Sequence, residues 1–207
     1  MNSEPILALT PGQRFCKRAL DLVASATGLL ILWPVLIISW FAAAISTRAN
    51  GFFIHHRVGR HGKLFPMLKL RSMINVEGVT SCVTADNDVR ITRTGRWLRR
   101  LKLDELPQLI NVFLGHMSLV GPRPDMPGYA DKLEGEERAI LALRPGITGP
   151  ASIVFRNEDE LLATVDDPEE YNDTVLWPEK VRINLLYLQE YSLGKDILFI
   201  LRTISGK

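Results

Sequence analysis

An uninterrupted apolar run dominates the first quarter of the chain. No charged side chain occurs between residues 22 and 47, and Pro34 lies near the middle of this run. A helix of this length would extend about 39 Å, which exceeds the roughly 30 Å hydrocarbon core of a bilayer. The run is therefore long enough to lie in a membrane. It is too long for the apolar core of a cleaved signal peptide, so we expect the finished protein to keep it.

Two features predict that the run enters the membrane and returns. Pro34 removes a backbone donor and its ring clashes with the preceding turn, so a helix should kink or break there. Basic residues flank both ends, whereas a spanning helix should show a charge bias. We therefore expect residues 19–47 to form a re-entrant helix-break-helix, with an ordinary proline-kinked anchor as the alternative. The flanking residues are Arg14, Lys17 and Arg18 before the run, and Arg48, Arg57, Arg60 and Lys63 after it.

A β-hairpin is predicted directly after the run. Residues 52–58 and 63–72 have strand-like patterns, and the turn at 59–62 contains glycines that can adopt positive φ. Strand alternation places Lys69 and Arg71 on one face of the second strand. Two neighbouring cations need an anionic partner or water, so this face is a candidate binding surface.

A basic helix is predicted after a polar, turn-rich stretch at 74–92, which we expect to be a mobile loop. Residues 95–103 place Trp97, Leu98 and Leu101 along one apolar edge and basic side chains elsewhere. That composition favours a helix lying flat at the headgroup level of a membrane. The alternative is a solvated helix that packs Trp97 into the core.

Three more helices are predicted from apolar periodicity. They cover residues 104–114, 178–190 and 194–204, and the last two are amphipathic. The apolar positions that define them are Leu106, Leu109, Ile110 and Phe113 in the first, Val181, Leu185 and Leu188 in the second, and Ile197, Leu201 and Ile204 in the third.

The predicted fold is one α+β domain, mostly helical, over residues 1–207. A short β-hairpin and amphipathic interfacial helices would belong to a small globular cytoplasmic part at 48–207, and the re-entrant membrane hairpin to 19–47. Residues 144–150 predict a loop, and the acidic residues 157–173 should lie at the surface.

Charge is distributed unevenly along the chain. Residues 1–103 carry 15 Lys and Arg against 5 Asp and Glu, whereas residues 104–207 carry 10 against 18. Basic residues beside an apolar run are attracted to anionic headgroups and can also bind phosphorylated ligands. We therefore expect anionic membrane lipids as partners, and no nucleic acid because of the membrane run. Cys16 and Cys82 form no C-x-x-C pattern, which predicts a reducing compartment.

Two adjacent acids and a proline-flanked arginine are the main candidates for chemistry. Asp104 and Glu105 should lie in the first turn of a helix, where its dipole and nearby basic residues favour the ionised carboxylates. Ionised carboxylates suit a nucleophile or a metal ligand, although acids at a helix start can also be simple caps. Arg123, between two prolines, presents a planar fork suited to two phosphate oxygens. Its alternative role is to stiffen a turn that closes the structure.

Other polar residues narrow the chemistry less. Lys69 could hold a diphosphate, or it could be a surface lysine with an extended stem. The four histidines lack metal-binding spacing, and neither a Walker A loop nor a G-x-G-x-x-G motif occurs. The common nucleotide cradles are therefore excluded.

Six segments occur in an order that points to one family. They are the apolar hairpin with its central proline, residues 62–73, residues 103–108, Asn111-Val112, residues 117–124 and residues 144–149. Through them the chain resembles the bacterial sugar transferase family, the monotopic phosphoglycosyl transferases, from Lys17 to Thr203. Members of this family pass a phosphosugar from a nucleoside diphosphate sugar to a polyprenyl phosphate.

The resemblance implies a mechanism and a site. Asp104 would be the nucleophile that forms an aspartyl phosphosugar and releases UMP, and Asp104 and Glu105 would hold Mg²⁺. Lys69, Arg71 and Arg123 would bind substrate phosphates. The implied substrates are a UDP-sugar and undecaprenyl phosphate at the cytoplasmic face of the bacterial inner membrane, in the first membrane step of surface glycan synthesis. A homodimer is left open.

Three departures from the family pattern stand out. Trp33 precedes Pro34 where the family usually has serine, which changes how a break would be stabilised, and Pro150 and Ser152 stand where tryptophan and glutamine are common. The latter change could alter sugar or base recognition. The chain also lacks the extra membrane helices of larger members, which predicts a minimal catalytic unit. The alternative function is a non-catalytic membrane adaptor whose basic half binds anionic lipid.

Overall fold

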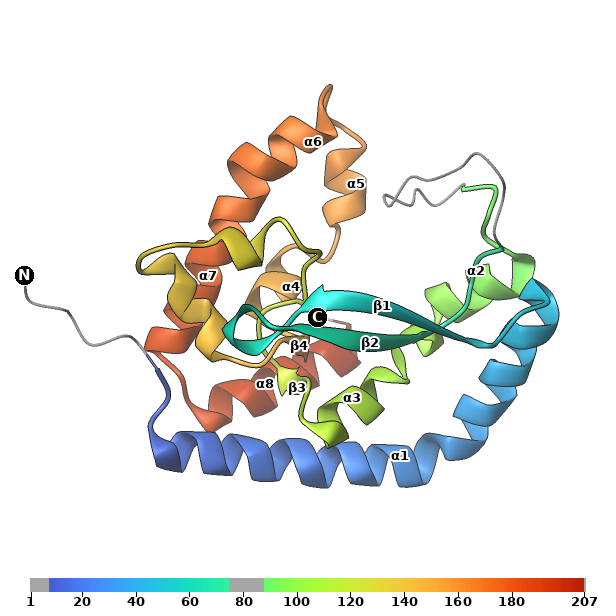
Figure 1. The fold of residues 1–207 in the computed structure, drawn as a ribbon, viewed down its shortest axis with the longest axis horizontal. Helices are drawn as coiled ribbons and strands as arrows, with labels where there is room; N and C mark the ends of the chain where they lie inside the picture. The colour runs from blue at the N-terminus through green and yellow to red at the C-terminus, as the bar shows by residue number, and fades with distance from the viewer. Residues whose placement is uncertain (1–7, 75–87, 207) are drawn as a thin grey trace, which may run out of the picture.

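The computed structural model describes residues 8–74 and 88–206, and the fold is mostly helical with a small antiparallel hairpin (Figure 1). The predicted fold class is confirmed in these respects. The helices are α1 Pro11–Thr47, α2 Arg93–Arg100, α3 Gln108–Leu114, α4 Pro150–Val154, α5 Glu158–Leu162, α6 Pro168–Tyr171, α7 Trp177–Gln189 and α8 Leu193–Ser205. The strands are β1 Phe52–Val58, β2 Leu64–Leu70, β3 Ser118–Val120 and β4 Gly146–Thr148.

The hairpin forms where the alternation predicted it. β1 pairs antiparallel with β2 from Phe52 opposite Leu70 to Val58 opposite Leu64, so β1 has the predicted bounds and β2 is shorter than expected. In the turn, positive φ occurs at His61 and Gly62, whereas Gly59 is extended. Gly59 is needed for space instead, because a Cβ there would lie 2.8 Å from the ring of Phe65.

Helix α1 is longer and more regular than the predicted helix-break-helix. It begins in a capping box, in which Thr10 and Gln13 bond each other's backbone N–H, and continues through Pro34 to Thr47. The helix bends in its second half (Figure 1). Within residues 11–47 the expected break is therefore a bend in one continuous helix, since neighbouring turns keep the helical backbone after Pro34 removes one donor.

The burial pattern of α1 is inverted relative to a helix in a water-soluble core. Its buried positions recur every fourth residue on one face and are mostly polar: Lys17, Asp21, Ser25, Ser39, Ala43 and Thr47. Large apolar side chains point outwards along its length: Phe15, Leu22, Val23, Leu30, Ile31, Trp33, Val35, Ile37, Ile38, Phe41 and Ile45. Among the described residues, α1 alone is long and apolar enough to cross a membrane. The exposed apolar face suits contact with lipid.

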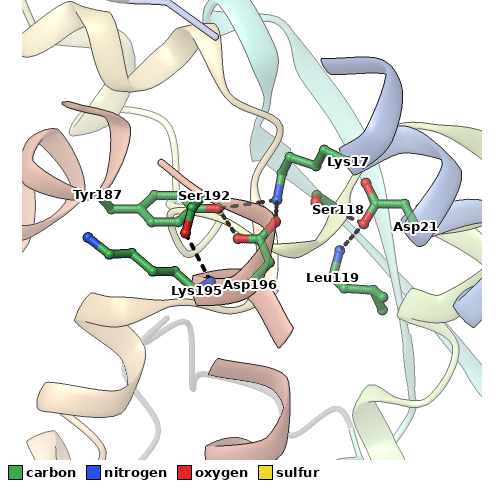
Figure 2. Close-up of polar contacts among 8 residues, drawn as sticks. All are labelled: Lys17, Asp21, Ser118, Leu119, Tyr187, Ser192, Lys195 and Asp196. Carbon is green, nitrogen blue, oxygen red and sulfur yellow. Dashed lines mark hydrogen bonds and ion pairs between the residues drawn. The ribbon is translucent and has the colours of Figure 1, made fainter. Parts of the chain in front are cut away.

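Polar contacts attach the first half of α1 to the rest of the protein. The buried ammonium of Lys17 lies 2.6 Å from Asp196 on α8, and Tyr187 on α7 donates its hydroxyl proton to the same carboxylate (Figure 2). One turn later, Asp21 accepts hydrogen bonds from the hydroxyl of Ser118 and the N–H of Leu119 in β3. The N-terminal half of α1 is therefore integrated into the fold by specific bonds.

Apolar packing attaches the second half of α1. Ala43 is buried against Leu70 of β2 and Leu98 of α2, and Trp40 and Leu103 pack at the edge of the same cluster. The first half of α1 also contacts α3. There Arg18 donates to the backbone carbonyls of residues 112 and 113 at 2.7 and 2.8 Å. Both halves of α1 thus contact the segment around residues 103–114.

A second, parallel pair of strands was missed by the sequence analysis. β3 pairs with β4, with Ser118 opposite Gly146 and Val120 opposite Thr148, so the predicted loop at 144–150 is partly a strand. Gly121, directly after β3, lies against Gly146 of β4. A Cβ on Gly146 would lie 2.2 Å from the backbone nitrogen of Gly121. Glycine is therefore required for the close approach of the two chains.

The faces of α3 and α8 differ from the periodicity prediction, and in α2 one of the two alternatives is excluded. In α2, Leu98 is buried but Trp97 is 62% exposed, so packing of Trp97 into the core is excluded. In α3, Phe113 is exposed and Asn111 is buried, because the Asn111 side chain bonds Leu68 N–H and the carbonyl of Pro66 in β2.

The same reversal occurs in α8, whose predicted core positions Ile197, Leu201 and Ile204 are exposed while Asp196 is buried. Helix α7 keeps its predicted face, with Val181 and Leu188 buried. Short helices α5 and α6 occupy the acidic segment, which is largely exposed as predicted. Most of the predicted mobile loop, residues 75–87 with Cys82, lies outside the described residues.

Candidate active site

Asp104 and Glu105 lie in a short 3₁₀ turn, Leu103–Glu105, instead of the first turn of the helix. The preceding Lys102 adopts a left-handed backbone conformation with φ 55°, and α3 begins only at Gln108, after Pro107. The turn packs between α1, α2 and β2 through Leu103. Packing of the 3₁₀ turn against its neighbours therefore positions both acids. The N-terminus of α3, which was expected to stabilise their charges, lies about one turn further along the chain.

Asp104 is buried and its Oδ1 atom has no hydrogen-bond partner among the described residues. Burial and the neighbouring charge of Glu105 raise the pKa of its carboxyl group, and the cations of Lys69, Arg99 and Lys102 only partly oppose this shift. The expectation that the Asp104 carboxylate is favoured by its surroundings is therefore wrong for the protein alone. A positively charged group beside the unpartnered oxygen would favour ionisation.

Glu105 behaves as predicted. Its Oε1 lies 3.0 Å from the ammonium of Lys69 and 3.7 Å from the guanidinium of Arg123. Burial opposes ionisation, but the charges of Lys69 and Arg123 outweigh it and lower the pKa of the Glu105 carboxyl group. The structure thus brings together three of the predicted residues, from β2, the 3₁₀ turn and the turn after β3.

Arg71 lies elsewhere on the hairpin. Its Nε donates to the carbonyl of Asn50, and its guanidinium stacks 5.5 Å from the ring centre of Phe53. Phe53 is opposite Lys69 in the sheet register, so Lys69 and Arg71 share a face as predicted. Of these two cations, Lys69 contacts Glu105, whereas Arg71 lies next to the end of α1.

A small polar pocket adjoins Glu105. Lys69, Arg123 and Gln108 are other polar lining residues, and Gly146 and Ile147 of β4 also line it. Arg57 also lines this pocket. Three cations and one carboxylate give the pocket a positive balance, which suits the oxygens of a phosphate or diphosphate.

Asp125, which the sequence analysis did not single out, is a further acid beside these cations. Burial raises the pKa of its carboxyl group to about 6, although the charges of Lys180, Arg123 and Arg57 act in the opposite direction. Its position two residues after Arg123 in the proline-rich turn is the feature of the sequence that could have identified it as a site residue. Its carbonyl accepts the N–H of Val58, so the turn is fastened to the end of β1.

The adjacent acids are a suitable but incomplete set of ligands for a divalent cation. Within residues 8–74 and 88–206, no group of three or more His, Cys, Asp or Glu side chains gathers in one place. Asp104 Oδ1 is an unpartnered buried acceptor next to a second carboxylate. Mg²⁺ commonly uses one or two carboxylates and completes its shell with water and substrate phosphates, so these two residues fit it.

Comparison with known proteins gives a consistent result. The model of the bacterial sugar transferase family matches residues 12–206. The chain is 36% identical to the undecaprenyl-phosphate galactose phosphotransferase of Salmonella typhimurium, over 92% of the chain and 40% of that protein. It is 35% identical to a UDP-glucose:undecaprenyl-phosphate glucose-1-phosphate transferase of Caulobacter vibrioides, over 91% and 68%. It is also 30% identical to an exopolysaccharide production protein, ExoY, of Rhizobium meliloti, over 95% and 87%. The chain spans about two fifths of the length of the Salmonella relative.

Proposed function

Because the chain belongs to the bacterial sugar transferase family, we propose that it moves a sugar-1-phosphate from a UDP-sugar to undecaprenyl phosphate in surface glycan synthesis. One observation carries the residue assignment. Asp104 is a buried carboxylate with an unpartnered oxygen, next to a second carboxylate that is held by two cations. A capping acid would have its oxygens on backbone N–H groups, and Asp104 Oδ1 has none.

In the proposed mechanism, Asp104 attacks the phosphorus that carries the sugar. A bond forms between the carboxylate oxygen and phosphorus, the bond to UMP breaks, and its electron pair leaves on UMP. An oxygen of undecaprenyl phosphate then attacks the same phosphorus, and Asp104 is released as a carboxylate. Mg²⁺ bound by Asp104 and Glu105 would neutralise phosphate oxygens and favour the ionised nucleophile.

Lys69 and Arg123 have two roles in this proposal. They hold Glu105 in its ionised form, and their remaining donors bind the diphosphate of the nucleotide sugar. Arg123 is well suited to the second role because its side chain is 58% exposed and can turn towards a ligand. Arg71 would contact a phosphate farther from Glu105.

The lipid substrate is accommodated by the position of the site next to α1. Leu103, the residue before Asp104, packs with Trp40 and Ala43 of α1, whose other side is apolar and exposed. We place the protein at the cytoplasmic face of the bacterial inner membrane with α1 in one leaflet. A polyprenyl phosphate lying in that leaflet would present its phosphate near the 3₁₀ turn.

The experiment is nucleotide release by purified protein given a panel of UDP-sugars and undecaprenyl phosphate. We expect UMP release that stops on removal of Mg²⁺ and falls by at least about a thousandfold in Asp104→Asn, since removing a nucleophile has effects of this size. Asp173→Asn, an exposed aspartate that accepts a bond from Tyr129, is the matched control and should keep full activity.

Mass spectrometry tests the covalent mechanism separately from the transferase activity. A phosphosugar on Asp104 in protein trapped without lipid acceptor would support the covalent step, and turnover by Asp104→Asn would overturn it. Absence of UMP release with every sugar tested, together with retained binding to anionic vesicles, would favour the membrane adaptor instead.

A further inference from the structure

A second basic cavity lies away from Asp104, at the start of α1. It has a volume of about 290 Å³ and is bounded by the first turns of α1, the tip of the β1–β2 hairpin and the segment before β4. Arg18, Arg60 and Arg144 line it from these three elements, and Arg14 and Lys17 are further basic residues in its wall. Asp21 is the one acid in its wall.

The three arginines are held by backbone carbonyls. Arg60 donates through Nε to Ala142, and Arg144 donates through Nε to Gly115, at 2.9 and 2.8 Å. Throughout the described ranges, none of Arg18, Arg60 and Arg144 forms an ion pair with a carboxylate, and the terminal nitrogens of Arg60 and Arg144 bond no protein acceptor. Two positioned guanidinium forks therefore keep donors for a ligand.

The charges in this cavity repel one another. Burial lowers the pKa of the Arg144 guanidinium, and the charges of Arg60 and Arg18 lower it further. Lys17 is already neutralised by Asp196 at 2.6 Å. The charge of Asp21 acts in the opposite direction, but it is one carboxylate against three guanidinium groups. An anion placed between the arginines would therefore relieve the remaining repulsion.

Asp21 supplies a second feature of the cavity. Its Oδ1 accepts bonds from Ser118 and Leu119, whereas Oδ2 is buried and has no partner in the part of the chain that the structure describes (Figure 2). A ligand that carries a hydroxyl beside its anionic group would satisfy this acceptor. Inorganic phosphate satisfies the arginines but has no separate hydroxyl-bearing arm.

We propose that this cavity binds the headgroup of an anionic membrane lipid, with the phosphodiester on Arg60 and Arg144 and a headgroup hydroxyl on Asp21. The location supports a lipid over a soluble anion. Arg18 lies one turn before the uncharged run at 22–47, and Phe15, at the same cavity, is 76% exposed. Charged groups at the end of a membrane segment lie at the depth of lipid phosphates. The site is separate from the transferase site, and the proposal stands without that activity.

The test measures thermal unfolding of the full chain in neutral detergent while phosphatidylglycerol is added. We expect the midpoint to rise with phosphatidylglycerol and saturate, because a ligand of the native state stabilises it by mass action. Phosphatidylcholine and inorganic phosphate should give no comparable rise. A rise of equal size with inorganic phosphate would assign the cavity to soluble anions and overturn the lipid proposal.

Charge-preserving variants separate a positioned fork from general attraction. Arg60→Lys and Arg144→Lys should each raise the half-saturating phosphatidylglycerol concentration by about tenfold, because lysine cannot form the bidentate contact. Arg96→Lys, on the exposed basic face of α2, is the matched control and should change it less than about twofold.

Loss of the bonds to Ala142 or Gly115 can lower the unfolding midpoint even without lipid. Each variant is therefore judged by how much phosphatidylglycerol raises its midpoint above its own lipid-free value. Equal half-saturation in all three variants and the wild type would show general attraction and refute the site.

Discussion

The buried ion pair between α1 and α8 leads to a quantitative prediction about stability. Lys17 and Asp196 are 6% and 1% exposed, their charged atoms are 2.6 Å apart, and Tyr187 donates to the same carboxylate. Asp196→Asn keeps the size and polarity of the side chain but leaves the ammonium of Lys17 buried without its counter-charge. Breaking a buried pair in this way costs about 3–5 kcal/mol.

The expected shift in unfolding temperature follows from the size of the chain. For a protein of about 200 residues, 1 kcal/mol corresponds to roughly 2–4 °C, so Asp196→Asn should unfold about 6–20 °C below the wild type. The four tryptophans provide an intrinsic fluorescence signal for this measurement in detergent. The double variant Lys17→Met/Asp196→Leu removes both charges, and its deficit should be smaller than that of Asp196→Asn although Tyr187 loses an acceptor.

An adjacent exposed pair provides the control. Lys195 and Glu190 are also 2.6 Å apart, but their side chains are 40% and 65% exposed. Lys195→Met should therefore cost less than about 1 kcal/mol, or under about 4 °C. If Asp196→Asn unfolds within about 2 °C of the wild type, or if the double variant is at least as unstable as Asp196→Asn, the buried pair does not hold α1 to α8.

Two further predictions concern pH and topology. Because the folded-state pKa of Asp125 is raised to about 6, the native protein binds an extra proton between about pH 4 and 6, so its unfolding free energy should fall by up to about 3 kcal/mol as pH rises through this window. Asp125→Asn should make this decline smaller in detergent-based unfolding titrations, although the raised pKa values of Asp21 and Asp104 leave part of it. An unchanged pH profile would contradict the assignment. For topology, Gly12→Cys and Ala49→Cys, each made after replacing Cys16 and Cys82 with serine, should resist a membrane-impermeant maleimide in intact cells and react after lysis. Labelling of one position from outside would show that α1 spans the bilayer.

Local sequence patterns predicted where the helices and strands lie better than they predicted which side of each helix is buried. The hairpin was predictable because alternation and turn glycines are local signals, and β1 has the expected bounds. The face of α8 was not, because its buried Asp196 is matched by Lys17, which lies 179 positions away. The strands β3 and β4 have three residues each, which is too short for a period-two pattern to be recognised.

At the site, the sequence predicted which residues come together, but it did not predict the protonation of every one of them. The proximity of Lys69, Glu105 and Arg123 was implied by family motifs, and the structure brings these three residues together. The ionisation of Asp104 was predicted in the wrong direction, because burial beside Glu105 depends on packing around the 3₁₀ turn that no local pattern reports. Asp125 could have been noticed from its position two residues after Arg123, but its burial and raised pKa depend on packing.

The polar stripe on α1 limits how the protein can be divided or recombined. Lys17, Arg18 and Asp21 complete bonds of α8, α3 and β3, so α1 is an internal support of the fold and not a tether attached to it. A fragment starting at residue 48 would leave a buried aspartate without its counter-ion and two strand and helix ends without partners. Joining residues 48–207 to a foreign helix would succeed only if that helix carried the equivalents of these three side chains.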